Sequence, residues 1–461
     1  MRGDPHRPTR RRSSGAVLSA AFLLVAVACS IGLPDWNPLP PTDLGSRPGR
    51  VDATSFPTRW PIKHVVFVIK ENRTFDNLFG RFPGADGATS GMDQGIARPL
   101  TPALDRIPID IVHCYECALQ AWNEGKMDGF ASVSAPADRY AYTQFGPKDL
   151  PAYWHWAKRF VLGDNFFASA QGPSFPNHLY TIAAQSGGTH DNPIQDLEQL
   201  RERHRTTGLF KAWGCDSVEE AYVPVEDREG KEVKVPPCFD FLTEGDLLLR
   251  AGIPWAYYSA TNMQNGYLWS AYDAVRHIRQ DTQLWQSHVF PVDGLVQDVR
   301  DDRLPPVTWV TPRFELSEHP EYSFCWGQNW TTRIVNAIMS SPMWKDTAIF
   351  ITWDDYGGFY DHVPPPQVDR FGFGIRVPLL LISPYAKAGY VDHTLGEFSS
   401  VLRFIEDNWG LSQLTHRDRD AANLSEAFDF SQEPRKPDPQ PVRTDCQGAQ
   451  FPDDPAPSVQ G

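Results

Sequence analysis

Two apolar segments that lie far apart in the chain each end in a run of polar, oxygen-bearing side chains. Residues 348–352 (AIFIT) precede 353–359 (WDDYGGF), and residues 64–69 (HVVFVI) precede 70–77 (KENRTFDN). Short apolar runs of this kind are typical of fully buried strands. Open α/β sheets bind their ligands beyond the carboxyl ends of the strands, so we expect the two polar runs to meet there. The chain is therefore predicted to contain a parallel sheet with a functional site at one edge.

The residues that directly follow these strands have the chemistry of metal ligands. Glu71 and Asn72 follow the first strand, and Asp354 and Asp355 follow the second. Carboxylate and amide oxygens favour hard cations. We therefore predict one divalent metal ion, with Ca²⁺, Mg²⁺ or Mn²⁺ preferred over Zn²⁺. A simpler alternative stays open from these residues alone, in which Asp354 caps the following turn and Asp355 is solvated.

Strand and helix patterns alternate along most of the chain. The strand patterns lie at 65–69, 160–162, 255–259, 307–310, 348–353 and 377–383, and the helix patterns lie at 153–158, 179–185, 246–251, 329–340 and 398–409. This alternation predicts an α/β fold with a mostly parallel sheet that is flanked by helices on both faces. The charged segment 191–237 interrupts the pattern and is predicted to form a small cap or insertion beside the sheet.

The two ends of the chain depart from this pattern. Residues 1–29 combine arginines with an apolar stretch that is too short for a membrane span and is typical of an export signal. At Cys29, lipid attachment and plain signal cleavage are both open outcomes. Residues 30–61 are predicted to form a Pro-rich linker and residues 431–461 a disordered tail. This leaves residues 62–430 as the globular domain.

Charge and cysteine content limit the partners and the compartment. The formal net charge of −14 argues against nucleic-acid binding, which requires a basic surface. Export allows disulfides to form. Cys215 and Cys238 flank a predicted hairpin at 222–235, and we expect them to be bonded. For Cys114 and Cys117, a local disulfide and two free thiols both remain open.

Ser174 stands where a Gly-Pro turn opens into a helix pattern. Unpaired N–H groups and the helix dipole favour an anion at such a position. A nearby metal ion would lower the pKa of the hydroxyl and make Ser174 a nucleophile. The alternative is that Ser174 only caps the helix, which is common for serine there. The pairing with two acidic runs favours the nucleophile, and the missing G-x-S-x-G pattern disfavours a Ser-His-Asp arrangement.

Taken together, these motifs resemble a family of phosphoesterases. The matching blocks lie at 62–76, 122–130, 172–180, 317–320, 353–363 and 377–384. The chain resembles the family of non-specific phospholipases C and related acid phosphatases, within the alkaline-phosphatase-like superfamily. The resemblance spans about residues 62–410. It implies an alkaline-phosphatase-like fold and a phosphoesterase catalytic domain over 62–430.

The resemblance also implies roles for individual residues. Metal ligation falls on Glu71, Asn72, Ser174, Asp354 and Asp355, with Ser174 also the catalytic nucleophile. Family histidines assist the phosphoryl or leaving group, and His319 is the better match here, with His362 the second. We expect the substrate to contact Arg73, Asn177 and His178.

We therefore predict an exported, metal-dependent phosphoesterase of the phospholipase C type, which hydrolyses phospholipid head-group diesters through a phosphoseryl intermediate. The alternative is a phosphomonoesterase of the acid-phosphatase type, because many family lipases carry Thr in place of Ser174 and Glu in place of Asp355. A non-catalytic binding module is disfavoured, since every expected ligand is present. The expected partners are a phospholipid or other phosphate ester and a membrane surface, met transiently or through a lipid anchor at Cys29, and no nucleic acid.

Overall fold

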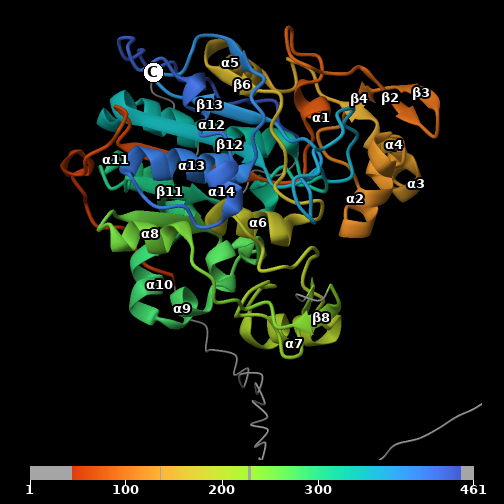
Figure 1. The fold of residues 1–461 in the computed structure, drawn as a ribbon, viewed down its shortest axis with the longest axis horizontal. Helices are drawn as coiled ribbons and strands as arrows, with labels where there is room; N and C mark the ends of the chain where they lie inside the picture. Colours follow the sequence, from red (N-terminus) through yellow and green to blue (C-terminus); the bar gives the residue numbers. More distant parts are fainter. Residues whose placement is uncertain (1–43, 135, 227–229, 448–461) are drawn as a thin grey trace, which may run out of the picture. The chain divides into compact units, whose positions relative to one another are not determined.

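A mixed sheet of eight strands runs through the structure in the order β10-β9-β11-β1-β12-β13-β6-β14 (Figure 1). Its strands are β1 (His64–Lys70), β6 (Val161–Gly163), β9 (Trp255–Ser259), β10 (Val289–Pro291), β11 (Val307–Val310), β12 (Thr347–Trp353), β13 (Leu379–Ile382) and β14 (Tyr390–Asp392). Every neighbouring pair is parallel except the two pairs made by β13, which is antiparallel to β12 and β6. The predicted fold class is confirmed. Only the short strands β10 and β14 were not predicted, because three-residue strands at the sheet margins carry too little pattern.

The computed structural model describes residues 44–134, 136–226 and 230–447. The predicted export signal with Cys29, part of the predicted linker and the last residues of the chain lie outside these ranges. Within them the helices are α1 (Phe75–Phe79), α2 (Tyr115–Trp122), α3 (Phe130–Ser134), α4 (Asp138–Ala141), α5 (Pro151–Arg159), α6 (Ser174–Ala183), α7 (Leu197–Thr207), α8 (Glu244–Arg250), α9 (Arg276–Gln280), α10 (Thr282–His288), α11 (Leu295–Arg300), α12 (Phe324–Met339), α13 (Phe398–Trp409) and α14 (His416–Asp420). In the described part of the chain, we find no helix with both the length and the apolar character needed to cross a membrane.

Helices cover both faces of the sheet, as side chains of β12 show. Phe350 packs against Phe404 of α13 with ring centroids 5.3 Å apart, whereas Trp353 packs against Tyr153 of α5 at 5.6 Å. Residues three apart in a strand point to opposite faces, so α13 and α5 lie on opposite sides. The β12 residues are all buried, which explains the unbroken apolar run in the sequence.

The segment 191–237 forms a small substructure beside the sheet. It contains α7 and an antiparallel hairpin of β7 (Val223–Glu226) and β8 (Glu232–Val235). The tip of the hairpin, at 227–229, lies outside the described residues. Cys215 and Cys238 are joined by a disulfide, with their Cα atoms 4.7 Å apart. Further short strands, β2 (Ser90–Asp93), β3 (Ile96–Pro99), β4 (Thr101–Pro102) and β5 (Thr143–Gln144), pair outside the main sheet.

Parts of the segments predicted as linker and tail contact the folded domain. Trp60 stacks on Phe404 and Phe430 at 4.8 and 5.4 Å, so the end of the predicted linker belongs to the core. At the other end, the Asn329 side chain of α12 donates a 2.8 Å hydrogen bond to the Arg443 carbonyl, and Cys446 is bonded to Cys325. Composition alone did not predict this contact for residues 431–447, because hydrogen bonds between its backbone and the side chains of Asn329 and Asn336 of α12, together with a disulfide, hold the segment.

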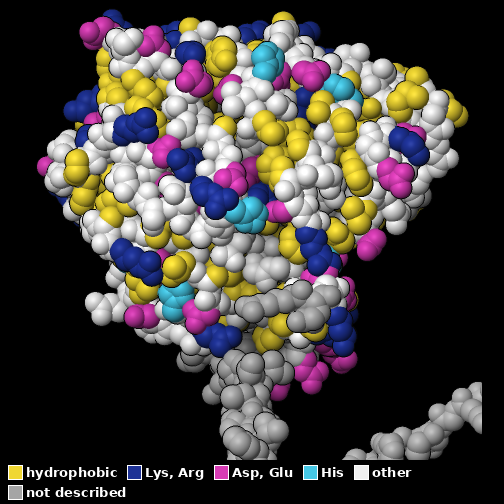
Figure 2. Space-filling view, viewed as in Figure 1, with side chains coloured by type: hydrophobic (Ala, Val, Ile, Leu, Met, Phe, Trp, Pro, Cys, Tyr) yellow, Lys and Arg dark blue, Asp and Glu magenta, His cyan; other side chains and the backbone are white. Residues whose placement is uncertain are grey.

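Figure 2 shows how charge is spread over the viewed face of the described residues. Lys and Arg side chains alternate with Asp and Glu side chains there, and they do not gather into one basic patch. Hydrophobic side chains are scattered among them, as on an ordinary protein surface. The chemistry of the molecule is therefore better sought among its buried polar groups than on this face.

Candidate active site

The carboxyl ends of β1 and β12 bring the two acidic runs together. The strands pair in parallel with Lys70 opposite Trp353, so the residues that follow them emerge side by side. The Asp354 amide donates to the Lys70 carbonyl at 2.9 Å, and the Asn72 amide donates to Asp354 Oδ1 at 2.8 Å. The Glu71 amide donates to the carbonyl of Ser317 at 3.0 Å, which joins the loop after β11 to the same edge.

The backbone at this edge adopts a left-handed conformation that few residues tolerate. Asn72 has a positive φ of 59°, and the facing Gly357 has a φ of 57°. A Cβ atom on Gly357 would lie 2.5 Å from Asn72 Cβ, so only glycine fits between the two strand ends. Asparagine is among the few non-glycine residues that adopt this conformation readily. The glycines after Asp355 thus let the two acidic runs approach each other.

Several buried acceptor atoms at this edge have no hydrogen-bond partner. Among the described residues, they include Glu71 Oε2, Asn72 Oδ1 and Asp354 Oδ2, on side chains that are fully buried. His178 Nε2 lies 3.0 Å from Glu71 Oε1 and 3.8 Å from Asp354 Oδ2. Buried polar atoms normally have partners. These residues therefore fit a divalent cation, which would satisfy the three oxygens at once.

The electrostatics of the cluster also favour a bound cation. Burial raises the pKa of Glu71 well above its usual value, and the neighbouring charges of Asp354 and Asp355 raise it further. Burial likewise raises the pKa of Asp355 well above normal, with Asp354 adding to the effect. Burial lowers the pKa of His178 to about 4, so its imidazole is neutral and available as a ligand. The carboxylates repel one another unless positive charge or protons offset them.

Ser174 faces this cluster from the first turn of α6. Its Oγ donates to Asp355 Oδ2 at 3.2 Å, while Asp355 Oδ1 accepts from the Gly357 amide at 2.7 Å. The helix begins at Ser174, and Pro173 occupies the N-cap position without a side-chain cap. Ser174 therefore does not serve as the capping residue, and its hydroxyl is directed to the carboxylate. His178, four residues later, lies on the same face of α6.

His113 joins the site from the irregular segment before α2. Its Nε2 lies 3.1 Å from Asn72 Nδ2, and its Nδ1 lies 2.5 Å from the Ile111 carbonyl. Burial lowers the pKa of His113, but the charges of Asp355 and Asp110 outweigh burial and raise it to about 9. The hydrogen bonds instead describe a neutral ring, with Nδ1 as donor and Nε2 as acceptor from Asn72. We favour the neutral ring for the metal-bound protein, because a cation would cancel the carboxylate charges that favour protonation.

His319 lies beside His113, with ring centroids 6.3 Å apart. Burial lowers its pKa well below the usual value, and the positive charge of Arg73 lowers it further. Its Nε2 is 3.7 Å from Asp110 Oδ1, and its Nδ1 has no hydrogen-bond partner in the described structure. His319 is therefore a neutral, buried imidazole with one free nitrogen.

A buried ion pair supports the loop that carries His319. Glu318 has a positive φ of 77° and accepts from Tyr153 Oη at 2.5 Å and from Trp353 Nε1 at 2.9 Å. Lys70 Nζ lies 3.3 Å from Glu318 Oε1. These contacts tie the residue before His319 to the last residues of β1 and β12.

Comparison with known proteins identifies the family. A model of the Phosphoesterase family matches residues 62–412, which is most of the chain. The chain belongs to the Phosphoesterase family. Similar curated proteins include the hemolytic phospholipase C of Pseudomonas aeruginosa (25% identical, covering 80% of this chain and 56% of that protein). Others are phospholipase C B of Mycobacterium tuberculosis (25%; 82% and 80%) and non-specific phospholipase C6 of Arabidopsis thaliana (27%; 84% and 74%).

The chain spans less than two thirds of the length of the Pseudomonas relatives. Among solved structures, a protein in the alkaline phosphatase superfamily from Vibrio parahaemolyticus is similar with a TM-score of 0.36 and 8% identity, covering 79% of this chain and 68% of that one. Murine ectonucleotide pyrophosphatase/phosphodiesterase 5 is similar with a TM-score of 0.40 and 9% identity, covering 79% of this chain and all of that one. These structural likenesses are too distant to carry an argument about the site.

Two residues that we expected to contact the substrate are held by the protein itself. The Asn177 amide accepts from the Ala170 N–H and donates to the carbonyls of Ala170, Gly172 and Pro173, which shapes the turn before Ser174. The Arg73 guanidinium lies over the rings of Phe359 and Phe324 and donates to the Asn72 carbonyl at 2.9 Å. Only the third residue, His178, lies in the cluster itself, beside the expected metal ligands.

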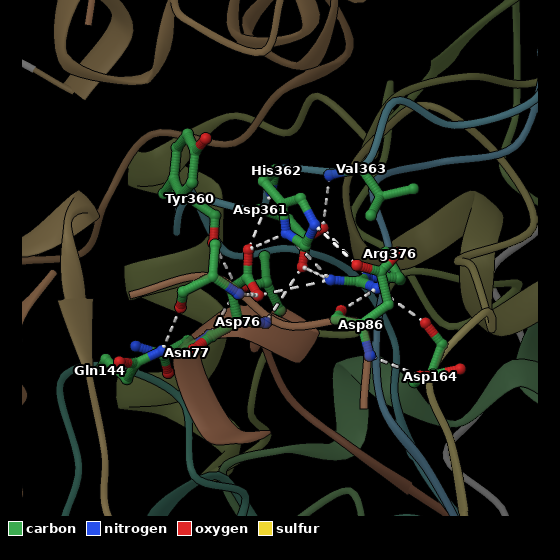
Figure 3. Close-up of polar contacts among 12 residues, drawn as sticks. Asp76, Asn77, Asp86, Gln144, Asp164, Tyr360, Asp361, His362, Val363 and Arg376 are labelled. Carbon is green, nitrogen blue, oxygen red and sulfur yellow. Dashed lines mark hydrogen bonds and ion pairs between the residues drawn. The ribbon is translucent and has the colours of Figure 1, made fainter. Parts of the chain in front are cut away.

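His362, predicted as a second catalytic histidine, belongs to a separate network (Figure 3). Its Nδ1 lies 2.7 Å from Asp76 Oδ2, and its Nε2 lies 3.2 Å from Asp86 Oδ1. Arg376 pairs with Asp361 at 3.0 Å and with Asp76 at 3.4 Å in the same network. Asp76 and Asp361 have no unpartnered carboxylate oxygen among those described, unlike Glu71 and Asp354. The structure therefore favours a structural role for His362.

This role predicts a stability effect that depends on pH. Burial lowers the pKa of His362, but the hydrogen bond and charge of Asp76 outweigh it and raise the pKa to about 9. A raised pKa stabilises the fold fully below the unfolded value of 6.5, and this contribution is lost as the pH rises through 9. We expect His362→Gln to lower the free energy of unfolding by about 1–3 kcal/mol at pH 6 and by less at pH 10, measured by urea denaturation.

The matched control is His393→Gln, because His393 bonds Asp164 in a similar way but its side chain is 64% exposed. That variant is expected to change stability by less than about 1 kcal/mol. Turnover per folded molecule should be unchanged in both variants. A large loss of turnover at full stability in His362→Gln would contradict the structural role.

Proposed function

We propose that this protein is an exported, metal-dependent phosphoesterase of the phospholipase C type. The observation that carries the proposal is the buried cluster at the carboxyl ends of β1 and β12. There, Ser174 Oγ bonds Asp355 beside carboxylate and amide oxygens that lack partners. A serine hydroxyl beside oxygen atoms that lack hydrogen-bond partners and could bind a cation suits phosphoryl transfer. That reaction depends on positioning and charge stabilisation.

The residues divide the chemistry between them. Glu71, Asn72, Asp354, Asp355 and Ser174 would hold the cation, with His178 as a further neutral ligand beside Glu71. When bound, a divalent cation lowers the pKa of the serine hydroxyl and offsets charge on the phosphoryl group. Asp355 Oδ2 already accepts the Ser174 proton in a hydrogen bond and so orients Oγ for attack.

In the first step, Ser174 Oγ passes its proton to Asp355 and forms a bond to phosphorus, while the bond from phosphorus to the diacylglycerol oxygen breaks and that oxygen leaves protonated. In the second step, water gives up a proton and attacks phosphorus, the Ser174 Oγ–P bond breaks as Oγ regains a proton, and the phosphoalcohol leaves. His319 is the proposed proton acceptor for that water, because it is neutral and its Nδ1 has no partner among the described residues.

Export is supported by the cysteines as well as by the N-terminal sequence. Three disulfides join Cys114 to Cys117, Cys215 to Cys238, and Cys325 to Cys446. Disulfides of this number are typical of proteins that fold outside the reducing cytosol. The choice of a phospholipid diester follows from the relatives, which are named phospholipases C.

A comparison of two substrates tests the substrate class. With a divalent cation present, purified protein is expected to release phosphocholine from phosphatidylcholine at least about tenfold faster than phosphate from an aryl phosphate, which corresponds to about 1.4 kcal/mol of discrimination. Hydrolysis of the monoester alone would contradict the lipase proposal and favour the phosphomonoesterase alternative. That alternative is motivated by Ser174 and Asp355, which stand where many family lipases carry Thr and Glu. Hydrolysis of neither ester would contradict both.

A further inference from the structure

The disulfide between Cys114 and Cys117 lies directly beside a histidine of the candidate site. Cys114 is the N-cap residue of α2, and Cys117 lies in its first turn, with the two Cα atoms 4.9 Å apart. The preceding residue is His113, whose ring is 3.1 Å from the expected metal ligand Asn72. Any change in the backbone at Cys114 is therefore one residue from the site.

This disulfide contributes little to global stability compared with the others. A disulfide stabilises a fold mainly by restricting the unfolded chain, and the effect grows with the length of the closed loop. Cys114 and Cys117 are separated by 3 residues in sequence, whereas Cys325 and Cys446 are separated by 121. The short disulfide therefore acts locally, by restricting the backbone at the end of the segment 103–114.

The segment before the disulfide is irregular, and it is anchored to the rest of the fold at separate points. Throughout residues 103–114, all of them described, the backbone forms neither helix nor strand. Ile111 is wedged against Gly358, where a Cβ atom would lie 2.2 Å from the isoleucine side chain. The disulfide, the N-cap hydrogen bond from the Cys117 amide to Cys114 Sγ at 3.2 Å and the hydrogen bond from the Ala118 amide to the Cys114 carbonyl at 2.9 Å fix the backbone after His113.

The bridge also has the features of a disulfide that exchanges readily. Cys114 is partly exposed, whereas Cys117 is 7% exposed. A thiolate at Cys114 would sit at the N-terminus of α2, where the helix dipole and the Cys117 amide stabilise negative charge. Stabilising the reduced form raises the reduction potential of a disulfide and makes it easier to open.

We propose that the Cys114–Cys117 disulfide is a redox-sensitive positioning element that holds His113 against Asn72. A dithiol reductant opens it by thiol–disulfide exchange. The sulfur–sulfur bond breaks, two electrons and two protons pass to the cysteines, and the dithiol is left as a cyclic disulfide. The freed segment then holds His113 less firmly against Asn72. The activity and metal-binding readouts rest on the proposed function, whereas the chemical readout does not.

The test uses the full, oxidised, metal-loaded protein in a series of dithiothreitol buffers of falling potential. At each potential, free thiols are alkylated and mapped by mass spectrometry, and kcat and KM are measured on both esters. We expect Cys114 and Cys117 to be the first pair that is alkylated. We also expect kcat to fall by about tenfold with that step, with KM little changed and with recovery on reoxidation. Full activity with the Cys114–Cys117 disulfide reduced would overturn the inference. Reduction of this disulfide only after the other two disulfides would overturn it as well.

Matched double variants separate this effect from loss of folding. The variant with Cys114→Ser and Cys117→Ser keeps an N-cap hydroxyl, and we expect it to show the lowered kcat with no response to dithiothreitol. The control with Cys215→Ser and Cys238→Ser should keep the redox response. Melting temperatures report whether each variant is folded. Wild-type kcat in the first variant would contradict the proposal.

A metal titration tests the inference even if neither ester is cleaved. Mn²⁺ affinity of the oxidised and reduced proteins is compared by calorimetry. We expect about tenfold weaker binding after reduction, because Asn72 then loses its partner. Equal affinities in the two states would overturn the inference, whether or not an ester is cleaved.

Discussion

Replacing Ser174 with alanine is expected to lower kcat by at least about 10⁴-fold on every phosphate ester that the protein cleaves, because loss of a nucleophile removes the whole covalent route. Ser174 makes one side-chain hydrogen bond, to Asp355, and no capping bond to α6. The variant should therefore stay folded, and circular dichroism and a melting curve check this. Kinetics on phosphatidylcholine and an aryl phosphate measure the loss.

Ser174→Thr is the matched variant, because it keeps a hydroxyl and resembles the threonine found in many family lipases. We expect it to keep measurable turnover, within about 10²-fold of the wild type, with the difference due to the added methyl group in a buried site. Rapid acid quenching with substrate should trap phosphate on the peptide that contains Ser174 in the wild-type protein. Full turnover in Ser174→Ala, or phosphate trapped on another residue, would refute the covalent mechanism.

Removing the metal ion is expected to have the second-largest effect. Chelation should lower kcat by about 10³-fold or more, because the cation offsets charge in the transition state. Ca²⁺, Mg²⁺ or Mn²⁺ added back should restore it. Chelation should also lower the free energy of unfolding, by about 2.7 kcal/mol if the ion had been present at 100 times its Kd. Kinetics and urea denaturation measure the two effects on the same samples.

The metal-free protein should also respond to pH in a defined direction. The pKa values of Glu71 and Asp355 in the fold are raised well above their usual 4.5 and 3.8, by burial first and then by their neighbours. A raised carboxyl pKa stabilises the fold fully below the unfolded value and is lost as the pH rises through the folded value. The metal-free protein should therefore be more stable at mildly acidic than at neutral pH, and bound metal should reduce that difference.

A pair of identical substitutions distinguishes the two acidic clusters. Asp354→Asn removes a carboxylate with an unpartnered oxygen, so we expect weaker metal affinity and about 10²–10³-fold lower kcat. Asp361→Asn changes a carboxylate that already pairs with Arg376, so we expect lower stability with unchanged metal dependence. Equal metal affinity in Asp354→Asn and the wild type would contradict the proposed site.

Much of the fold follows from local pattern. The central strands β1 and β12 are buried on both faces, so their apolar runs stand out in the sequence. Parallel pairing of those two strands then brings Glu71, Asn72, Asp354 and Asp355 together, as their sequence context predicts. Composition was a weaker guide to the chain ends, because the segment at 431–447 is held by hydrogen bonds and a disulfide that no local pattern shows.

For the candidate site, sequence located the proposed acidic ligands and the proposed nucleophile, because each follows a recognisable strand or opens a recognisable helix. Ser174 and His178 are one helical turn apart, so both lie on the same face of α6. Only the tertiary structure decided among the other histidines. It brings His113 to Asn72 from an irregular segment and places His362 in a network with Asp76. Contacts between loops depend on how distant segments pack, and neither periodicity nor spacing along the chain records that.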